Sequence, residues 1–340
     1  MAPRAAIVGC AGTALTPEER ALFAETDPAG FILFRRNCEH PEQVRALVDA
    51  LRDSVGRADA PVLIDQEGGR VARLTQPHWT VPPAAARFGA LAAFDPAAAR
   101  RAAWLNGRVI GADLIGLGIT VNTLPVLDCP APDADPVIGD RAFAREPEVV
   151  TALGRATAAG LLAAGVAPVM KHIPGHGRAR VDSHHALPRI PADLAALAAA
   201  DFEPFRRLNE LPWAMTAHAV FDAVDPERPT TTSAAAIGGA IRERIGFDGV
   251  LVSDDLGMAA LAGDLGARAG AALAAGCDLV LHCSGHPDEV RQVLAACDGI
   301  SGRTQTRLHA AESHRRAQAD RGAFDIEAAR RELDALLTTM

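Results

Sequence analysis

The chain reads LLAAGVAPVMKHIPGHGRARVDSHHALPRI from residue 161 to residue 190. This stretch contains the end of an alanine-rich helical segment, Gly165, a short apolar run up to Met170, and then a polar loop. Glycine commonly follows the last turn of a helix, and a continuous apolar run is typical of a strand covered on both faces. The loop is rich in proline and glycine and fits no helical period, so we predict irregular backbone there. The stretch therefore predicts one helix–strand–loop unit whose polar side chains follow the strand.

Seven more apolar runs of this kind occur along the chain. With the run above they give eight predicted strands, at residues 5–8, 30–34, 61–65, 119–127, 168–172, 213–218, 249–254 and 278–283. Alanine-rich helical segments separate them, and Gly246 and Gly276 precede the last two strands as Gly165 precedes the fifth. Eight such units in 340 residues favour a (β/α)8 barrel of the TIM type. A doubly wound open sheet is the alternative, but no Gly-x-Gly-x-x-Gly follows any strand, which weakens its dinucleotide-binding version.

Local signals mark where the helices begin. Residues 16–19, Thr-Pro-Glu-Glu, have the pattern of a capping box, with a proline at the first helical position. Residues 95–96, Asp-Pro, open a second helix in the same way. Both helices precede predicted strands, as the barrel requires.

The C-terminal part of the chain lacks a predicted strand. Within residues 301–340 we predict helices at 307–320 and 326–337, packed on the barrel. The segment 129–140, rich in proline and aspartate, is predicted to be a loop after the fourth strand, because no linker long or polar enough to divide the chain is present. We therefore expect residues 1–340 to form a single catalytic domain.

Composition excludes several classes of protein. The chain is 49% hydrophobic and 22% charged, and its net charge is −8 with no basic block, so a nucleic-acid partner is not expected. No apolar run approaches the roughly 20 residues of a membrane span. The six cysteines are scattered, as in proteins of a reducing cytoplasm. Residues 7–10, Ile-Val-Gly-Cys, look like a lipoprotein cleavage box, but only nine residues precede the cysteine, so we assign them to the first strand.

Polar side chains gather at the ends of the predicted strands. In a barrel these ends meet at one face, where catalysis takes place. Lys171 is the strongest candidate for a functional residue, because burying an ammonium group costs free energy unless it is paired. His218 and His282 could instead be core histidines with satisfied hydrogen bonds. The residues at or just beyond strand ends are Asp65, Glu67, Arg73, Asp128, Arg141, Lys171, His172, His218, Asp254, Asp255 and His282.

Two kinds of reaction fit this set of polar side chains at the strand ends. His172 and His176, with an acid, could bind zinc in a metal-dependent hydrolase. The loop is irregular, however, so their four-residue spacing does not place them on one helical face, and no His-x-His follows the first strand. The other chemistry is glycoside hydrolysis, which needs a carboxylate on one side of the sugar carbon and a proton donor on the other. Asp254 could be the carboxylate, and a histidine oriented by an aspartate could be the donor, since an imidazole pKa of about 6.5 suits proton exchange near neutrality.

Seven segments carry a family resemblance. They are GFILFRRN (30–37), LIDQEGGRVARL (63–74), PVLD (125–128), GDRAF (139–143), KHIPGHG with a downstream DSH (171–184), MTAHAVF (215–221) and GFDGVLVSDDLGM (246–258). In these segments the chain resembles the β-N-acetylglucosaminidases of glycoside hydrolase family 3. It looks most like the single-domain bacterial enzymes of peptidoglycan recycling. Departures are small: Ile173 and Gly257 stand where Phe and Ser are common, and residues 178–181 form a variant loop.

The resemblance implies roles for individual residues. Asp254 matches the nucleophile that forms a covalent glycosyl-enzyme. His184 matches the general acid/base, with Asp182 beside it tuning its charge and orientation. Because a loop rather than a strand carries His184, we expect it to be mobile without ligand and to close over a bound sugar. The sugar-binding positions of the family correspond to Asp65, Arg73, Arg141, Lys171 and His172.

The implied activity is that of a retaining exo-β-N-acetylglucosaminidase. The expected substrate is GlcNAc-1,6-anhydro-MurNAc, with or without peptide, cleaved by a cytoplasmic monomer that needs no metal or cofactor. A β-glucosidase or a GlcNAc phosphorylase of the same family is the alternative, and a metal-dependent barrel hydrolase comes far behind. A sugar-binding protein without catalysis is disfavoured because both implied catalytic groups are present.

Overall fold

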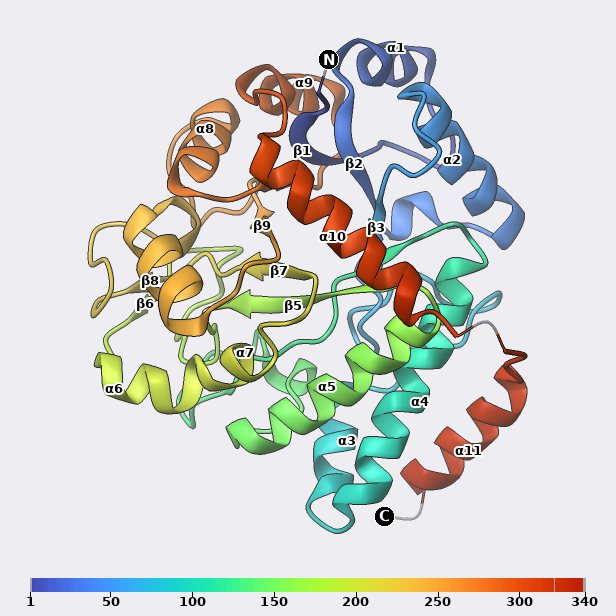
Figure 1. The fold of residues 1–340 in the computed structure, drawn as a ribbon, viewed down its shortest axis with the longest axis vertical. Coiled ribbons are helices and arrows are strands. Elements are labelled where there is room, and N and C mark those ends of the chain that lie inside the picture. The colour runs from blue at the N-terminus through green and yellow to red at the C-terminus, as the bar shows by residue number, and fades with distance from the viewer. Residues whose placement is uncertain (1, 321, 339–340) are drawn as a thin grey trace.

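The computed structural model describes residues 2–320 and 322–338, and within them eight parallel strands close into a barrel. The strands lie in the order β1, β10, β9, β7, β5, β4, β3, β2 around the barrel (Figure 1). Their bounds are β1 (Arg4–Gly9), β2 (Pro28–Leu33), β3 (Val62–Ile64), β4 (Val121–Asn122), β5 (Ala167–Ile173), β7 (Trp213–Thr216), β9 (Val250–Asp255) and β10 (Leu279–His282). Each lies within or next to one of the eight runs predicted from the sequence, so the (β/α)8 prediction is confirmed.

Helices surround the barrel and connect its strands (Figure 1). The α-helices are α1 (Pro17–Thr26), α2 (Pro41–Ser54), α3 (Ala85–Ala92), α4 (Pro96–Ile115), α5 (Pro147–Ala163), α6 (Leu194–Ala196), α7 (Glu203–Arg207), α8 (Leu265–Ala275), α9 (Pro287–Ala296), α10 (Gly302–Gln318) and α11 (Ile326–Thr338). Short 3-10 turns are η1 (Arg35–Asn37), η2 (Gly139–Arg141) and η4 (Thr230–Thr232), and π-helical segments are η3 (Leu197–Asp201) and η5 (Ala236–Ile245). None of the described helices is long and apolar enough to cross a membrane.

The predicted helix signals form the expected caps. The Thr16 hydroxyl accepts a hydrogen bond from the Glu19 amide at 3.1 Å, and the Glu19 carboxylate accepts one from the Thr16 amide at 2.9 Å, which completes a capping box. Asp95 caps α4 through two backbone amides. Gly246 and Gly276 adopt left-handed backbone at the ends of η5 and α8, while Gly165 lies one residue beyond the cap of α5.

The fourth strand is much shorter than predicted. Residues 119–127 were expected to be one strand, but β4 covers only two residues, and Val126 forms an isolated bridge with Lys171. The interruption falls at Pro125, which has no amide to donate to a ladder; its carbonyl still accepts a hydrogen bond from Lys171 N at 3.0 Å. The chain therefore leaves the barrel wall and returns to it just before Asp128.

The structure also contains two strands that the sequence did not indicate. β6 (Arg189–Ile190) pairs with β8 (Val220–Phe221) outside the barrel. Each is only two residues long, too short for a periodic hydrophobic signal. Their pairing fixes the downstream end of the loop that begins after β5.

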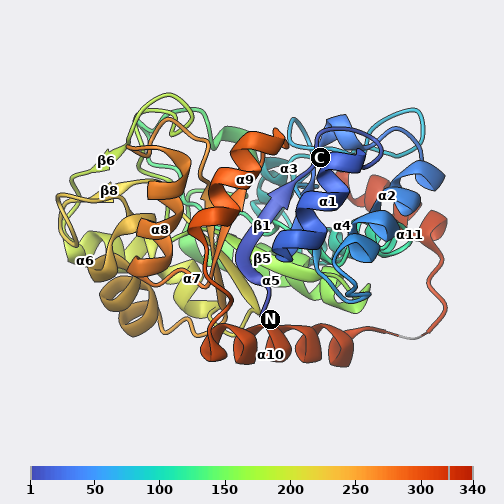
Figure 2. The same cartoon turned by 90° about the horizontal axis from the view of Figure 1, so that it is seen from above.

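Apolar side chains fill the inside of the barrel. They include Ile7, Leu63, Val169, Trp213 and Leu281, all buried. The second helix from the C-terminus, α10, lies across the end of the barrel where the strands begin (Figure 2), and its Ala311 joins the same apolar cluster. This helix begins at Gly302, five residues before its predicted start, because Ser301 caps it. The polar end of the barrel is the opposite one.

Candidate active site

A pocket of about 330 Å³ opens at the carboxyl ends of the strands. Its lining brings together all eight residues that the sequence marked as catalytic or sugar-binding: Asp65, Arg73, Arg141, Lys171, His172, Asp182, His184 and Asp254. They come from β5, β9 and the segments that follow β3, β4 and β5. This convergence is the one expected for a barrel whose strands all run in the same direction.

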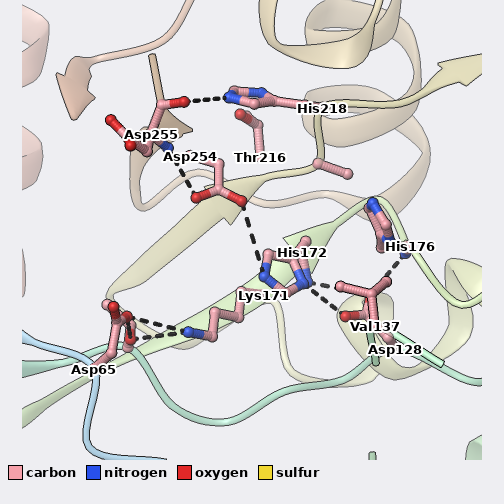
Figure 3. A network of polar contacts seen from close by, with 12 residues as sticks. Asp65, Asp128, Val137, Lys171, His172, His176, Thr216, His218, Asp254 and Asp255 are labelled. Atoms are coloured by element: carbon pink, nitrogen blue, oxygen red, sulfur yellow. Dashed lines mark hydrogen bonds and ion pairs between the residues drawn. The ribbon is translucent and has the colours of Figure 1, made fainter. Parts of the chain in front are cut away.

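Lys171 is the centre of a charged cluster at the pocket floor. It is 2% exposed, and its Nζ lies 2.9 Å from Thr123 Oγ1 and 3.3 Å from Asp65 Oδ1. Arg73 donates to the other oxygen of Asp65 at 2.8 Å. Burial alone would raise the pKa of Asp65, but Lys171 and Arg73 outweigh it and hold that pKa far below its ordinary value. Asp65 is therefore an ionised acceptor at neutral pH (Figure 3).

Glu67 is a member of this cluster whose role the sequence did not indicate. Its carboxylate accepts two hydrogen bonds from Arg141, both at 2.8 Å, and lies 2.5 Å from Lys171 Nζ. Burial opposes its ionisation, but Lys171 and Arg141 lower the pKa of Glu67 to about 2. Glu67 thus holds two of the predicted sugar-binding cations in place. Its position two residues after Asp65 indicates that it lies near the same strand end, but the sequence does not show which cations it contacts.

His172 connects a buried acid with Asp254. Its Nδ1 lies 2.7 Å from Asp128 Oδ2, and its Nε2 lies 4.0 Å from Asp254 Oδ2 (Figure 3). Asp128 is fully buried, and contacts with His172 and His176 lower its pKa to about 2 against the opposing effect of burial. Asp128 was predicted to lie at a strand end but was given no role in the site.

Asp254 and Asp255 are neighbours at the end of β9, but their carboxylates have different surroundings. Asp254 faces the pocket with its side chain 20% exposed, and its Oδ1 accepts a hydrogen bond from the Asp255 amide at 2.8 Å. Burial opposes the ionisation of Asp255, but His282 and the amides of Gly257 and Cys283, which donate to its carboxylate at 3.0 and 3.1 Å, lower its pKa. Asp255 is thus engaged by His282 and the backbone, while one oxygen of Asp254 faces His172.

His218 is a satisfied core histidine. Its Nδ1 lies 2.7 Å from Thr231 Oγ1, and its Nε2 donates to the carbonyl of Asp255 at 3.0 Å. The ring is 1% exposed, and burial lowers its pKa. This is one of the two interpretations left open by the sequence, and it explains how the ring supports the backbone next to Asp254.

The predicted acid/base pair lies on the loop after β5. His184 Nδ1 is 2.7 Å from Asp182 Oδ1, and the same oxygen accepts from the His184 amide at 2.8 Å. Burial opposes the ionisation of Asp182, but hydrogen bonds from His184 lower its pKa. The His184 side chain is 60% exposed, and within the described residues its ion-pair partner is Asp182 and not Asp254. The pair lines the pocket mouth in an open arrangement.

Only part of this loop is anchored. Gly177 accepts a hydrogen bond from Ala131 N at 2.8 Å and packs so closely that an added Cβ would lie 2.1 Å from the Cys129 carbonyl. A salt bridge of 2.6 Å joins Arg178 to Asp201 on η3. Beyond this anchor Val181 is exposed, but Ser183 is buried and its carbonyl accepts a hydrogen bond from the Ala260 amide at 3.2 Å. The loop is thus anchored at separate points, and the His184 side chain extends from it toward solvent.

Asp201 is an unusual anchor, because it is buried without full compensation. It is 1% exposed, its Oδ2 pairs with Arg178, and its Oδ1 has no partner among the described residues. Burial raises its pKa to about 6 even though Arg178 opposes the shift. Its ionised form therefore costs the folded state free energy.

The zinc alternative finds little support in the donor geometry. His172 and His176 lie with ring centroids 5.8 Å apart, and His172 Nδ1 is engaged by Asp128. Within residues 2–320 and 322–338, no group of three or more His, Cys, Asp or Glu side chains is arranged to hold a metal ion. Both ring nitrogens of His176 are buried and have no hydrogen-bond partner among the residues that the structure describes.

Comparison with known proteins agrees with this geometry. Residues 7–315 match the glycosyl hydrolase family 3 N-terminal domain. A β-hexosaminidase of Alkalilimnicola ehrlichii is 44% identical over 310 residues, which cover 89% of this chain and 88% of that protein. The β-hexosaminidase of Methylococcus capsulatus is 40% identical over 92% of both chains. Among solved structures, NagZ from Neisseria gonorrhoeae in complex with N-trifluoroacetyl-D-glucosamine superposes with a TM-score of 0.88 at 32% identity, covering 99% of both chains.

Replacing Asp201 with a neutral residue tests how much free energy of unfolding is lost by burying its ionised carboxylate. Because its folded pKa of about 6 lies above the ordinary value, its contribution to stability is fully present below about pH 4 and is lost as pH rises through 6. Asp201→Asn removes that loss, so the free energy of unfolding of the variant relative to the wild type should rise between pH 4.5 and pH 8, by on the order of 2 kcal/mol. Urea unfolding at both pH values measures the difference.

The matched control is Asp133→Asn. Asp133 pairs with Arg180 of the same loop, but its side chain is 60% exposed. An exposed pair contributes under about 1 kcal/mol, so this variant should change little at either pH. A stability difference for Asp201→Asn that is the same at both pH values would refute the assignment of an uncompensated buried charge.

Proposed function

The chain belongs to glycoside hydrolase family 3 and is a β-N-acetylhexosaminidase, and we propose that it is a retaining exo-enzyme of peptidoglycan recycling. Its proposed substrate is GlcNAc-1,6-anhydro-MurNAc, with or without peptide, from which it removes the terminal β-1,4-linked N-acetylglucosamine. The observation that carries the proposal is the placement of Asp254, on a strand end, in the same pocket as the loop-borne Asp182–His184 pair. One carboxylate and one separate proton donor are the groups that this reaction needs.

The proposed reaction has two displacements. In the first, an oxygen of Asp254 attacks the anomeric carbon while the imidazolium of His184 gives its proton to the leaving oxygen, so a glycosyl ester forms as the glycosidic bond breaks. In the second, neutral His184 takes a proton from water, whose oxygen attacks the same carbon and releases Asp254. Two inversions at one carbon give net retention. Asp182 would stabilise the imidazolium and orient the ring through Nδ1.

The charged cluster supplies the proposed sugar contacts. Asp65 would accept hydrogen bonds from sugar hydroxyls, and Lys171 with Arg73 and Arg141 would donate. Each of these cations is already paired with Asp65 or Glu67, so the cluster is pre-organised before the sugar arrives. Binding then needs no new burial of an unpaired charge.

Site and fold together support the remaining proposals. A pocket of about 330 Å³ suits one terminal sugar rather than an internal segment of a polymer. We propose that the protein works as a monomer in the cytoplasm, without a metal or cofactor. Residues 1–340 would act as one catalytic domain, with the C-terminal helices as part of its packing.

A chromogenic β-N-acetylglucosaminide tests the activity itself. The purified protein should release the chromophore together with free N-acetylglucosamine, and the rate should not depend on added phosphate. The β-glucoside should react far more slowly. Formation of the sugar 1-phosphate would instead identify a phosphorylase, a use of phosphate that a neutral histidine permits because it repels the anion less than a carboxylate does. Sugar binding without turnover would identify a binding protein.

Asp254 is expected to carry the covalent intermediate. An activated 2-fluoro glycoside slows the second step, so mass spectrometry of the digested protein should find the adduct on Asp254. Asp254→Asn should retain fold and sugar affinity while kcat falls by about 10⁴-fold or more. The companion variant Asp255→Asn should still form the adduct on Asp254. An adduct on any other residue would contradict the assignment.

His184 and Asp182 are expected to act as a unit. His184→Ala should lower kcat/KM by about 10²–10⁴-fold for substrates with poor leaving groups, and far less for activated aryl glycosides, which need no protonation. Asp182→Asn should show the same pattern, and the double variant should be little worse than either single one. Equal losses on both substrate classes would leave His184 as a binding residue only.

A further inference from the structure

We propose that Asp128 is a positioning residue for this reaction, which acts by fixing the protonated nitrogen of His172 and so controls the face that His172 presents to the sugar and to Asp254. The proposal rests on the proposed function, because it concerns the same pocket. Asp128 itself does not line the pocket. Its effect therefore has to pass through another residue.

Asp128 makes three hydrogen bonds within one short segment. Its Oδ1 accepts from the backbone amides of His172 and His176, at 3.2 and 2.6 Å, and its Oδ2 pairs with the His172 ring at 2.7 Å. The carboxylate is completely buried. The amide bonds fix which oxygen faces the backbone, and this leaves the other oxygen aimed at the ring.

The geometry decides the tautomer of His172. An ionised carboxylate can only accept hydrogen bonds, so Nδ1 must carry the proton of this contact. In the neutral ring Nε2 then carries a lone pair, which can accept a hydrogen bond from a sugar hydroxyl. The gap of 4.0 Å between Nε2 and Asp254 Oδ2 is too long for a direct hydrogen bond. Because Nε2 and Oδ2 are then both acceptors, a sugar hydroxyl near them can donate its single proton to Nε2 and leaves Oδ2 without that proton.

The opposite tautomer would place a donor in front of Asp254. A proton on Nε2 could form a hydrogen bond with the attacking oxygen as the ring shifts, and would occupy the lone pair that the nucleophile needs. Asp128 therefore keeps the sugar side of His172 free. Ring orientation by a buried acid is the same physical device as in catalytic triads.

Asp128→Asn tests this with little change of shape. Its amide oxygen can still accept from the amides of His172 and His176, which leaves the NH₂ group facing Nδ1 and forces the proton to Nε2. We expect kcat on a chromogenic N-acetylglucosaminide to fall by about 10²-fold or more, with a much smaller change in KM. In a His172→Ala background, the same substitution should have almost no further effect on kcat.

A purely structural role for Asp128 gives a different result. If Asp128 only tied the start of the loop to the barrel, its loss would multiply with that of His172→Ala, and such multiplicative losses would overturn the proposal. Asp278→Asn is the matched control, because Asp278 is also a buried acid with a backbone amide contact but pairs with Arg307 of α10 at the other end of the barrel. It should lower stability without a comparable change in kcat.

A measurement on the wild-type protein covers the case in which Asp128→Asn does not fold. The ¹⁵N shifts of labelled histidine rings report the tautomer, and the His172 signal is assigned by its loss in His172→Ala. A neutral ring protonated only on Nδ1 agrees with the proposal, and a proton on Nε2, in the neutral ring or in the imidazolium, overturns it. If the wild-type protein does not release the sugar at all, the proposed function fails; if it does and Asp128→Asn is fully active, only this inference fails.

Discussion

Charge pairing around one buried lysine organises the pocket. The ammonium of Lys171 lies at the end of a central strand, where it would be strongly destabilising without partners. Asp65 and Glu67 provide them, and the same two carboxylates hold Arg73 and Arg141. Removing Glu67 would leave the largely buried guanidinium of Arg141 without its carboxylate partner, at a cost of about 3–5 kcal/mol. The proposed sugar-binding surface is therefore held in place by these ion pairs.

The proposed catalytic groups divide between rigid and adaptable elements. Asp254 is placed by strand β9 and by the amide of Asp255, so its position is fixed by the barrel. The His184 side chain is exposed and extends from a loop that is anchored at Gly177, Arg178 and Ser183. Such a division gives one reacting group a fixed position and allows the other to move with the substrate.

Much of this could be predicted from the sequence, and the limits have physical causes. Apolar runs and glycine stops located all eight barrel strands, because buried parallel strands have a strong composition signal. The length predicted for β4 was wrong, because residues 119–127 were treated as one strand although they include Asn122, Thr123 and Pro125, and Pro125 cannot donate to a ladder. Strand-end position marked Lys171 and Asp254 correctly as pocket residues. The contacts of Glu67 with Arg141 and Lys171, and of Asp128 with His172, were not predicted. They depend on which side chains meet across the barrel, and sequence spacing does not contain that information.

The filled interior of the barrel and the position of α10 determine how a substrate can reach the pocket and how a product can leave it. Apolar side chains occupy the barrel interior, and α10 covers the end opposite the pocket. The pocket is therefore a blind one, with a single opening for entry and exit. A chain cannot thread through it, so a released sugar must leave by the way it came before the next terminus can enter. In the proposed reaction, product release and substrate entry therefore share one route and must follow one another.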